Sequence, residues 1–244
     1  TNLDLNTFNT RNVTDMESMF VGCSSLTNLN VSSFNTNKVT NMKYMFDVCE
    51  NLTSLDVANF NTSKVTDMAY IFANMNKVTK IKGIENFKTS NVVDMSCMFY
   101  QCHNLASIDV SNFNTNNVTN MRGMFDYCRT LTTLDVSNFN TSKVTDISYM
   151  FAYMYELTEI KGIENLETSN ATTMECMFAY DSKLTTLDIS KFNTNNVTNM
   201  RAMFYGCSNL KTIYVGTGWT TQNVTNSENM FYKCGTSEVT LKTA

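Results

Sequence analysis

The sequence has no proline, one histidine, one tryptophan and only 8 glycines among its 244 residues. A loop-rich enzyme normally uses more proline and glycine in its turns, so this composition argues against that class of protein. The longest apolar runs are a few residues long, far short of the roughly 20 that span a bilayer. Charged residues make up 16% of the chain and the net charge is −4. Neither a nucleic-acid-binding surface nor a basic membrane patch is indicated.

What the sequence does contain is one apolar pair that recurs every 26 or 27 residues. Its copies are Met19-Phe20, Met45-Phe46, Ile71-Phe72, Met98-Phe99, Met124-Phe125, Met150-Phe151, Met177-Phe178, Met203-Phe204 and Met230-Phe231. A period of roughly 20 to 50 residues is typical of a solenoid, because one unit cannot bury its apolar face without neighbours. Since no linker interrupts the period, we expect a single solenoid domain over residues 1–244. The chain opens inside a repeat, and we expect it to be a fragment of a longer surface protein.

Each unit has the pattern of one rung. Leu29 and Val31 alternate with polar residues, which predicts a short strand with both side chains inward. Met42, Met45 and Phe46 are spaced i, i+3, i+4, which favours one helical turn. We therefore expect an α/β repeat fold: a right-handed leucine-rich-repeat-like solenoid of about nine 26–27-residue rungs, with a parallel β-sheet and short helical turns.

A polar column runs beside the core. One asparagine follows the core phenylalanine in most rungs: Asn9, Asn35, Asn61, Asn114, Asn140 and Asn193. An inward Asn or Thr at this corner can bond the turns above and below, and so satisfy buried backbone groups.

A longer period of 79 residues lies over the short one. The sequence Ile-Lys-Gly-Ile-Glu-Asn occurs at residues 81–86 and again at 160–165. The simplest interpretation is duplication of a three-rung block. We expect the extra residue of each block to lie in the turn near Gly83 or Gly162.

These columns resemble the bacterial surface protein 26-residue repeat, in the BspA-like branch of the leucine-rich repeats. The residues that carry the resemblance are those of 60–68, Phe-Asn-Thr-Ser-Lys-Val-Thr-Asp-Met, followed by Met-Phe, Cys and Leu-Thr-x-Leu-Asp-Val-Ser. The chain departs from the pattern at Met75, Met154, Asp181 and Trp219. The resemblance implies a secreted or cell-wall-attached bacterial protein used in adhesion to host or neighbouring cells. It carries over no catalytic residue.

The cysteines form two columns. The main column contains Cys23, Cys49, Cys102, Cys128, Cys207 and Cys234. Side chains in register would place Cβ atoms near 4.8 Å apart, longer than the roughly 3.5–4.5 Å of a disulfide, so we expect buried free thiols. No C-x-x-C pair is present, and neither a metal site nor a cofactor is expected. Cys97 and Cys176 lie in a second column, where partial exposure is expected.

His103 and Trp219 are each single residues of their type. His103 occupies a variable turn position beside no matching nucleophile, so we expect an exposed surface residue and no enzymatic activity. Trp219 falls in the phenylalanine column, which favours core packing over a glycan platform.

Two surface rows are candidates for binding. The first is an acidic row on the outward side of the strand: Asp56, Asp109, Asp135 and Asp188. The second is aromatic and is the preferred contact site: Tyr100, Tyr127, Tyr153, Tyr180, Tyr205 and Tyr232. Tyrosine supplies contact area at low entropic cost and is favoured at interfaces. A solvated sheet face and tyrosines lying flat over a convex turn are the alternatives.

The hypothesis for function is non-catalytic adhesion at the bacterial cell surface, through an extracellular protein or glycan ligand. The full-length protein would be cell-wall or lipid anchored, with no membrane insertion by this chain and no nucleic-acid partner. The open end rungs are expected either to pair in a homodimer or to be capped by further sequence of the full-length protein. The alternatives are a structural spacer or stalk with no ligand of its own, and an ice- or mineral-binding lattice on a threonine column that runs from Thr10 to Thr221.

Overall fold

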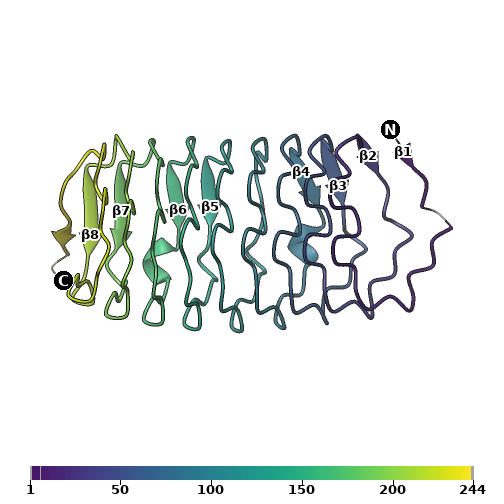
Figure 1. Cartoon of the computed structure of the whole chain (residues 1–244), viewed down its shortest axis with the longest axis horizontal. Helices are drawn as coiled ribbons and strands as arrows, with labels where there is room; N and C mark the ends of the chain where they lie inside the picture. Colours follow the sequence, from purple (N-terminus) through teal and green to yellow (C-terminus); the bar gives the residue numbers. More distant parts are fainter. Residues whose placement is uncertain (1, 6, 243–244) are drawn as a thin grey trace.

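The computed structural model describes residues 2–5 and 7–242. Over these residues the chain winds into an elongated parallel β-solenoid of about seven turns, with β1 and β8 at opposite ends (Figure 1). This confirms the predicted leucine-rich-repeat-like solenoid, whereas the predicted count of about nine rungs is not confirmed. The predicted domain of 1–244 also includes residues 1, 6, 243 and 244, which lie outside the described residues.

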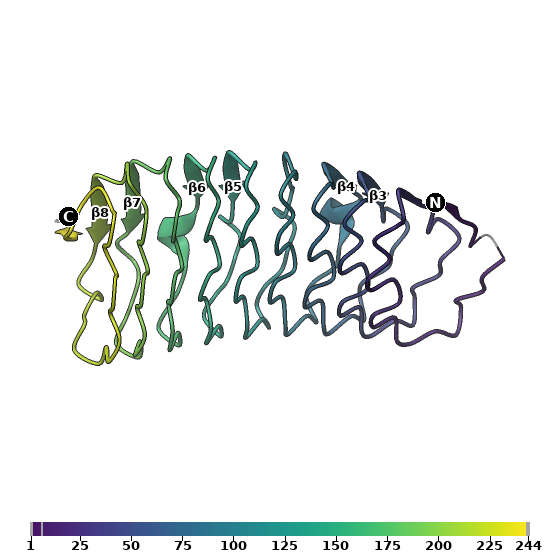
Figure 2. The same cartoon turned by 45° about the horizontal axis from the view of Figure 1, so that its top comes forward.

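The strands are short and pair only with strands of neighbouring turns. They are β1 (Asn2–Leu3), β2 (Asn28–Leu29), β3 (Ser54–Asp56), β4 (Lys80–Lys82), β5 (Thr133–Asp135), β6 (Glu159–Lys161), β7 (Thr186–Ile189), β8 (Thr212–Val215) and β9 (Thr240–Leu241). All pairs are parallel, and in the described part of the chain they form the sheets β1-β2, β3-β4, β5-β6 and β7-β8-β9. Figure 2 shows the labelled strands along one edge of the stack. Apolar side chains such as Leu55 and Ile81 face inward, as the alternation predicts.

The Met-Phe segment is a run of tight turns and not a helix, so the prediction of helical turns is wrong. Alternate N–H groups donate to the next turn at 3.0–3.1 Å: Met42 to Asp67, Tyr44 to Ala69, Phe46 to Ile71 and Val48 to Ala73. The intervening groups donate three residues back at 3.1–3.2 Å: Met45 to Met42, Asp47 to Tyr44 and Cys49 to Phe46. An α-helix needs i→i−4 bonds from every residue. In the Met-Phe segment, every second backbone N–H donates to the neighbouring turn instead.

Two 3₁₀ helices are the only helices among the described residues. They are η1 (Ile84–Asn86) and η2 (Ile163–Asn165), and each follows a left-handed glycine, Gly83 at φ 91° or Gly162 at φ 79°. A Cβ on Gly83 would lie 2.3 Å from the Cα of Ala58. The extra residue of each three-rung block is therefore accommodated where the sequence predicts it.

The core is a ladder of stacked rings. The phenylalanines of the repeated pair stack from Phe20 to Phe231 with centroids 5.5–6.2 Å apart. Met45 and Phe46 have no exposed surface, and the same holds in the inner turns. The ladder confirms that the period of the pair is the period of the fold.

A buried threonine column closes the corner beside the core. The Thr115 hydroxyl donates to the carbonyl oxygen of Asn140 at 2.9 Å and accepts from its N–H at 2.7 Å. The Asn140 side chain turns outward and accepts from the Ser142 N–H at 3.0 Å. Thr10, Thr36, Thr62, Thr89, Thr141, Thr168 and Thr194 are buried in the same way. The inward residue expected at this corner, Asn or Thr, is therefore threonine. Because the threonine column is buried, it is not an exposed lattice, which contradicts the ice-binding alternative.

The cysteines are free thiols throughout the described part of the chain. In the main column, Cys49, Cys102, Cys128 and Cys207 are buried, as predicted, while Cys23 and Cys234 are half-buried. Each buried thiol contacts a carbonyl oxygen of the preceding turn, for example Cys102 with Phe72 at 3.1 Å. Cys97 and Cys176 are also buried, so the expected partial exposure of this second column is wrong.

Candidate functional site

Each 26–27-residue repeat places two residues in left-handed backbone at fixed positions. The first left-handed column contains Ser18, Tyr44, Tyr70, Cys97, Gly123, Tyr149, Cys176, Ala202 and Asn229, with φ of 53–59°. The second left-handed column contains Gly22, Val48, Asn74, Gln101, Tyr127, Tyr153, Tyr180, Gly206 and Lys233, with φ of 55–73°. Glycine occupies only three of these positions. The repeat therefore holds large side chains in a conformation that costs L-residues roughly 1–2 kcal/mol each.

The six predicted tyrosines form one continuous aromatic chain, here called the tyrosine ridge. Their ring centroids follow one another at these distances: Tyr100–Tyr127 6.3 Å, Tyr127–Tyr153 4.2 Å, Tyr153–Tyr180 4.9 Å, Tyr180–Tyr205 5.0 Å and Tyr205–Tyr232 5.2 Å. All are half-buried except Tyr232, which is exposed. Each stacked pair contributes about 0.5–1.5 kcal/mol beyond its buried area, which offsets part of the backbone strain.

A pocket of about 340 Å³, here called the Cys97 pocket, lies between the two left-handed columns. Its lining residues are Tyr70, Cys97, Tyr100, Arg122, Gly123, Asp126, Tyr127, Tyr149 and Tyr153. The Arg122 guanidinium carbon lies 4.8 Å from the centroid of the Tyr149 ring and an N–H donates to the Ser148 hydroxyl at 3.0 Å. A cation thus covers one aromatic wall.

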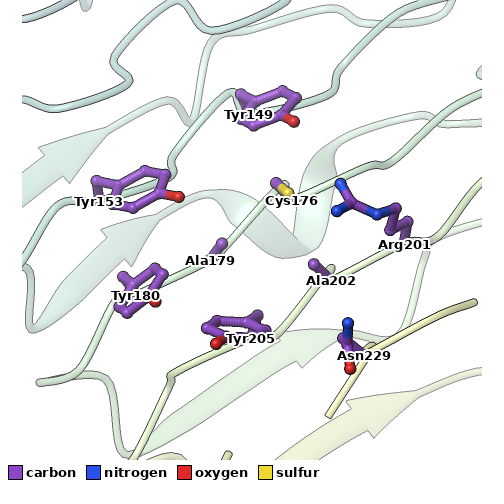
Figure 3. Close-up of a pocket in the computed structure, with 9 residues that line it drawn as sticks. All are labelled: Tyr149, Tyr153, Cys176, Ala179, Tyr180, Arg201, Ala202, Tyr205 and Asn229. Carbon is purple, nitrogen blue, oxygen red and sulfur yellow. The ribbon is translucent and has the colours of Figure 1, made fainter. Parts of the chain in front are cut away.

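A second pocket of about 320 Å³, here called the Cys176 pocket, lies further along the stack. Figure 3 shows Tyr149, Tyr153, Tyr180 and Tyr205 around a floor of small side chains, with Arg201 and Asn229 on the other side. Arg201 and Cys176 lie 79 residues after Arg122 and Cys97, so this pocket is the duplicate of the first. It differs from the Cys97 pocket in three lining residues, because Ala179, Ala202 and Tyr205 replace Tyr100, Gly123 and Asp126.

Burial in the Cys97 pocket favours the neutral forms of Asp126 and Cys97, because it raises the pKa of both groups. Burial raises the pKa of Asp126 to about 8, against the nearby Arg122 guanidinium, which lowers it. Burial also raises the pKa of the Cys97 thiol to about 11, and the thiol hydrogen-bonds the Tyr70 hydroxyl. The Asp126 residue is 6% exposed, and its carboxyl Oδ1 has no hydrogen-bond partner among the described residues.

The acidic row lies on the strand segment of the rungs and has a structural role. Each Oδ1 accepts the N–H two residues on: Asp56 from Ala58, Asp109 from Ser111, Asp135 from Ser137 and Asp188 from Ser190, at 3.0–3.1 Å. Lys82 and Lys242 pair with Asp56 and Asp188. These carboxylates close the turns after the strands, and a binding role for them stays a prediction.

His103 packs beside the tyrosine ridge, whereas Trp219 packs against the core. His103 is half-buried and not exposed as expected, because its ring packs against Tyr127 with centroids 6.2 Å apart. Burial lowers its pKa, and the Arg129 charge lowers it further. Trp219 is half-buried and packs against the core, in agreement with the preference for core packing.

The pocket residues that were missing from the predicted site include Tyr70, Arg122, Asp126, Tyr149 and Arg201. The 79-residue period was the signal that could have found the two tyrosines and the two arginines. Tyr70 and Tyr149 are 79 residues apart, as are Arg122 and Arg201. No such repeat marks Asp126, whose counterpart is Tyr205.

The fold and its repeated columns define a leucine-rich-repeat-like solenoid, a class of repeat protein. A family model described as "Mycoplasma protein of unknown function, DUF285" matches residues 1–81, 74–160 and 133–243, and the chain belongs to this family. The prediction that the chain belongs to a family of repeat proteins with a unit of about 26 residues is confirmed. No curated protein matches the chain.

Two solved structures resemble the chain. One is a leucine rich cell surface protein from Faecalibacterium prausnitzii, with 16% identity, a TM-score of 0.36 and coverage of 88% of this chain and 76% of that one. The other is a leucine-rich repeat protein from Bacteroides ovatus, with 16% identity, a TM-score of 0.38 and coverage of 83% of this chain. The chain spans 59% of the length of the second protein.

Proposed function

We propose that this chain is a non-catalytic binding domain that contacts an extracellular protein or glycan through the tyrosine ridge. The observation that carries the proposal is the left-handed backbone of Tyr127, Tyr153 and Tyr180. Strained conformations at repeated positions persist where the side chain has a use that outweighs the strain. Asn74 and Gly206 occupy the same column at lower cost, so the fold itself does not require tyrosine there.

The geometry of the ridge supports contact with a large ligand. The rings of Tyr127 and Tyr153 are stacked with an interplanar angle of 7°, and those of Tyr153 and Tyr180 with an angle of 21°. Arg129 lies over the Tyr127 ring, 5.2 Å from its centroid, which adds a cationic edge. Pre-stacked tyrosines lose little rotamer entropy on binding, and Tyr and Arg are among the residue types enriched in interface hot spots.

We also propose a location at the bacterial cell surface, secreted or anchored by other parts of the full-length protein. The support is the resemblance of the repeat to surface proteins. Among the described residues, no helix has the length and apolar character needed to cross a membrane. The proposed ligands therefore come from host or neighbouring cells.

The second candidate function is a structural spacer that holds another domain away from the cell. The carboxylates of Asp56, Asp109 and Asp135 favour it. Each makes the same local hydrogen bond to the backbone, so the strand face repeats one stabilising contact along the solenoid. A spacer would use that face for stability alone and would bind nothing when isolated.

The test is binding of the purified chain to immobilised matrix proteins, mucins and glycans. The variant Tyr127→Asn/Tyr153→Asn/Tyr180→Asn removes the central rings and keeps a residue type that the same column already holds at position 74. We expect saturable binding at micromolar concentration or tighter, weakened at least tenfold by the triple variant. The control Asp109→Asn/Asp135→Asn changes the acidic row and should bind like the parent. Absence of binding by a folded parent would favour the spacer.

A further inference from the structure

The first left-handed column is a ring stack with a gap. The rings of Tyr44 and Tyr70 stack with centroids 4.8 Å apart. The next two turns carry Cys97 and Gly123 in place of rings, and Tyr149 resumes the column. Because neighbouring strands lie about 4.8 Å apart, Tyr70 and Tyr149 are separated by about 14 Å along the stack. The Cys97 pocket is the space left by the two missing rings.

The floor and walls of this gap are built by small and aromatic side chains. Gly123 is buried, and an added Cβ there would lie 3.1 Å from the Cys97 Sγ. Tyr70 closes one end, while Tyr127 and Tyr153 of the ridge form the side. The volume of about 340 Å³ lies at the lower end of the roughly 300–1,000 Å³ of small-molecule sites. The gap therefore accepts one or two small rings.

Asp126 supplies the polar group of the gap. Its carboxyl lines the pocket, is almost completely buried and has an Oδ1 without a partner in the described part of the chain. A buried polar atom without a partner costs the full desolvation of that group. A ligand that brings hydroxyl groups to this side chain would remove that cost.

The charges of the gap select against other ligand classes. Arg122 places a guanidinium on the face of Tyr149, which opposes a cationic ligand such as an ammonium group. The same guanidinium already interacts with the Asp146 carboxylate at 3.8 Å and the Ser148 hydroxyl at 3.0 Å, so its charge is not free for an anion. A neutral ring with one apolar face and several hydroxyl groups matches both the aromatic walls and the unpartnered carboxyl oxygen of Asp126.

We propose that the Cys97 pocket binds a neutral pyranose unit of a glycan, stacked on Tyr70, with its hydroxyls bonded to Asp126. This inference rests on the proposed binding function and names its ligand class. The Cys176 pocket lacks the carboxyl, because Tyr205 stands at the position of Asp126. It binds the same sugar more weakly.

The experiment is saturation-transfer NMR and calorimetry of the whole chain with methyl glycosides of glucose, galactose, mannose and N-acetylglucosamine. The test variant is Gly123→Tyr, which places in the gap the residue that the column carries at position 149. The matched control is Ala202→Tyr, which fills the Cys176 pocket and leaves the Cys97 pocket open. We expect at least one glycoside to bind, with affinity lost tenfold or more in Gly123→Tyr and unchanged in Ala202→Tyr.

A second variant keeps the test decisive if Gly123→Tyr does not fold, which circular dichroism would show. Asp126→Leu keeps the side chain large and removes its hydrogen bonds, and we expect the same tenfold loss. Equal glycoside binding by the parent, Gly123→Tyr and Asp126→Leu overturns the proposal. Binding of aromatic peptides in place of sugars also overturns it. If no glycoside binds while the chain still binds matrix protein through the ridge, the pocket inference is wrong and the proposed function stands. If neither binds, both fail.

Discussion

Tyr127 and Tyr153 lie one turn apart with ring centroids separated by 4.2 Å and planes inclined by only 7°. Both residues have left-handed backbone, with φ of 62° and 56°. The conformation that costs each residue free energy is also the one that aligns their rings along the stack. The ridge is therefore a product of backbone geometry repeated at an interval of one turn.

The backbone strain can be measured at a position without ring stacking. Val48 has φ 60° and is β-branched, so Val48→Asn should raise the free energy of unfolding by about 1 kcal/mol. The reciprocal change Gly22→Val, in the same column, meets no atom within 4 Å of its new Cβ. It should destabilise by ~1–2 kcal/mol through the backbone alone. Urea unfolding measures both, and a stabilising Gly22→Val would contradict the strain.

The threonine column should be sensitive to loss of its hydroxyl. Thr115→Val keeps the shape but leaves the N–H and carbonyl of Asn140 without their partner, which should cost about 2–4 kcal/mol. Thr119→Val is the control, because this exposed hydroxyl donates only a 3.3 Å bond to Val93. Its effect should stay within about 0.5 kcal/mol. Similar losses in the two variants would show that the buried hydroxyl has no special role.

Asp181 gives the stability of the chain a pH dependence. It occupies the main cysteine column, where burial raises its pKa well above the ordinary value of 3.8, although the Met154 N–H bond lowers it. The stability linked to its proton is fully present below pH 3.8 and is lost as the pH rises through the raised pKa. Asp181→Cys should therefore be more stable than the parent at pH 7.

The stabilisation by Asp181→Cys should shrink as the pH falls toward 4, and denaturant unfolding from pH 4 to 8 measures it. Asp109 provides the opposite sign, because hydrogen bonds from Ser111 lower its pKa. The stability linked to Asp109 is present above the ordinary value and lost as the pH falls through the lowered pKa. If the effect of Asp181→Cys on stability does not change with pH, the Asp181 carboxyl is exposed to water and its pKa is not raised.

Gly83 should be the least replaceable residue at the duplicated turn. Gly83 has a φ of 91°, and the Cβ added by Gly83→Ala would lie 2.3 Å from the Ala58 Cα. Because this neighbour is a backbone atom, the backbone itself must move. We expect a loss of roughly 2 kcal/mol or more in unfolding free energy, since the loss combines backbone strain and overpacking. Gly22→Ala is the control, with left-handed backbone but open space. Equal losses would exclude the close approach as the cause.

The columns of the core could be predicted because their spacing alone determines which side chains stack. The Met-Phe pair, the cysteine column and the turn at Gly83 all follow from counting residues. The turns around Tyr44 and Val48 could not, because the spacing of Met42, Met45 and Phe46 fits a helix equally well. Tyrosine and valine also oppose the left-handed backbone that the structure requires. The pocket was missed because it is an absence of rings, and no local motif marks an absence.

The alternation of hydrogen bonds in the Met-Phe segments has a mechanical consequence. Half of the N–H groups there point along the stack to the next turn, so a force applied to the two ends loads those bonds in tension, one turn after another. Each turn that detaches releases 26 or 27 residues, which extend to roughly 90 Å at full stretch. A chain of this kind lengthens in many small steps under load, and the turns that stay closed keep their ring stacks while it does so.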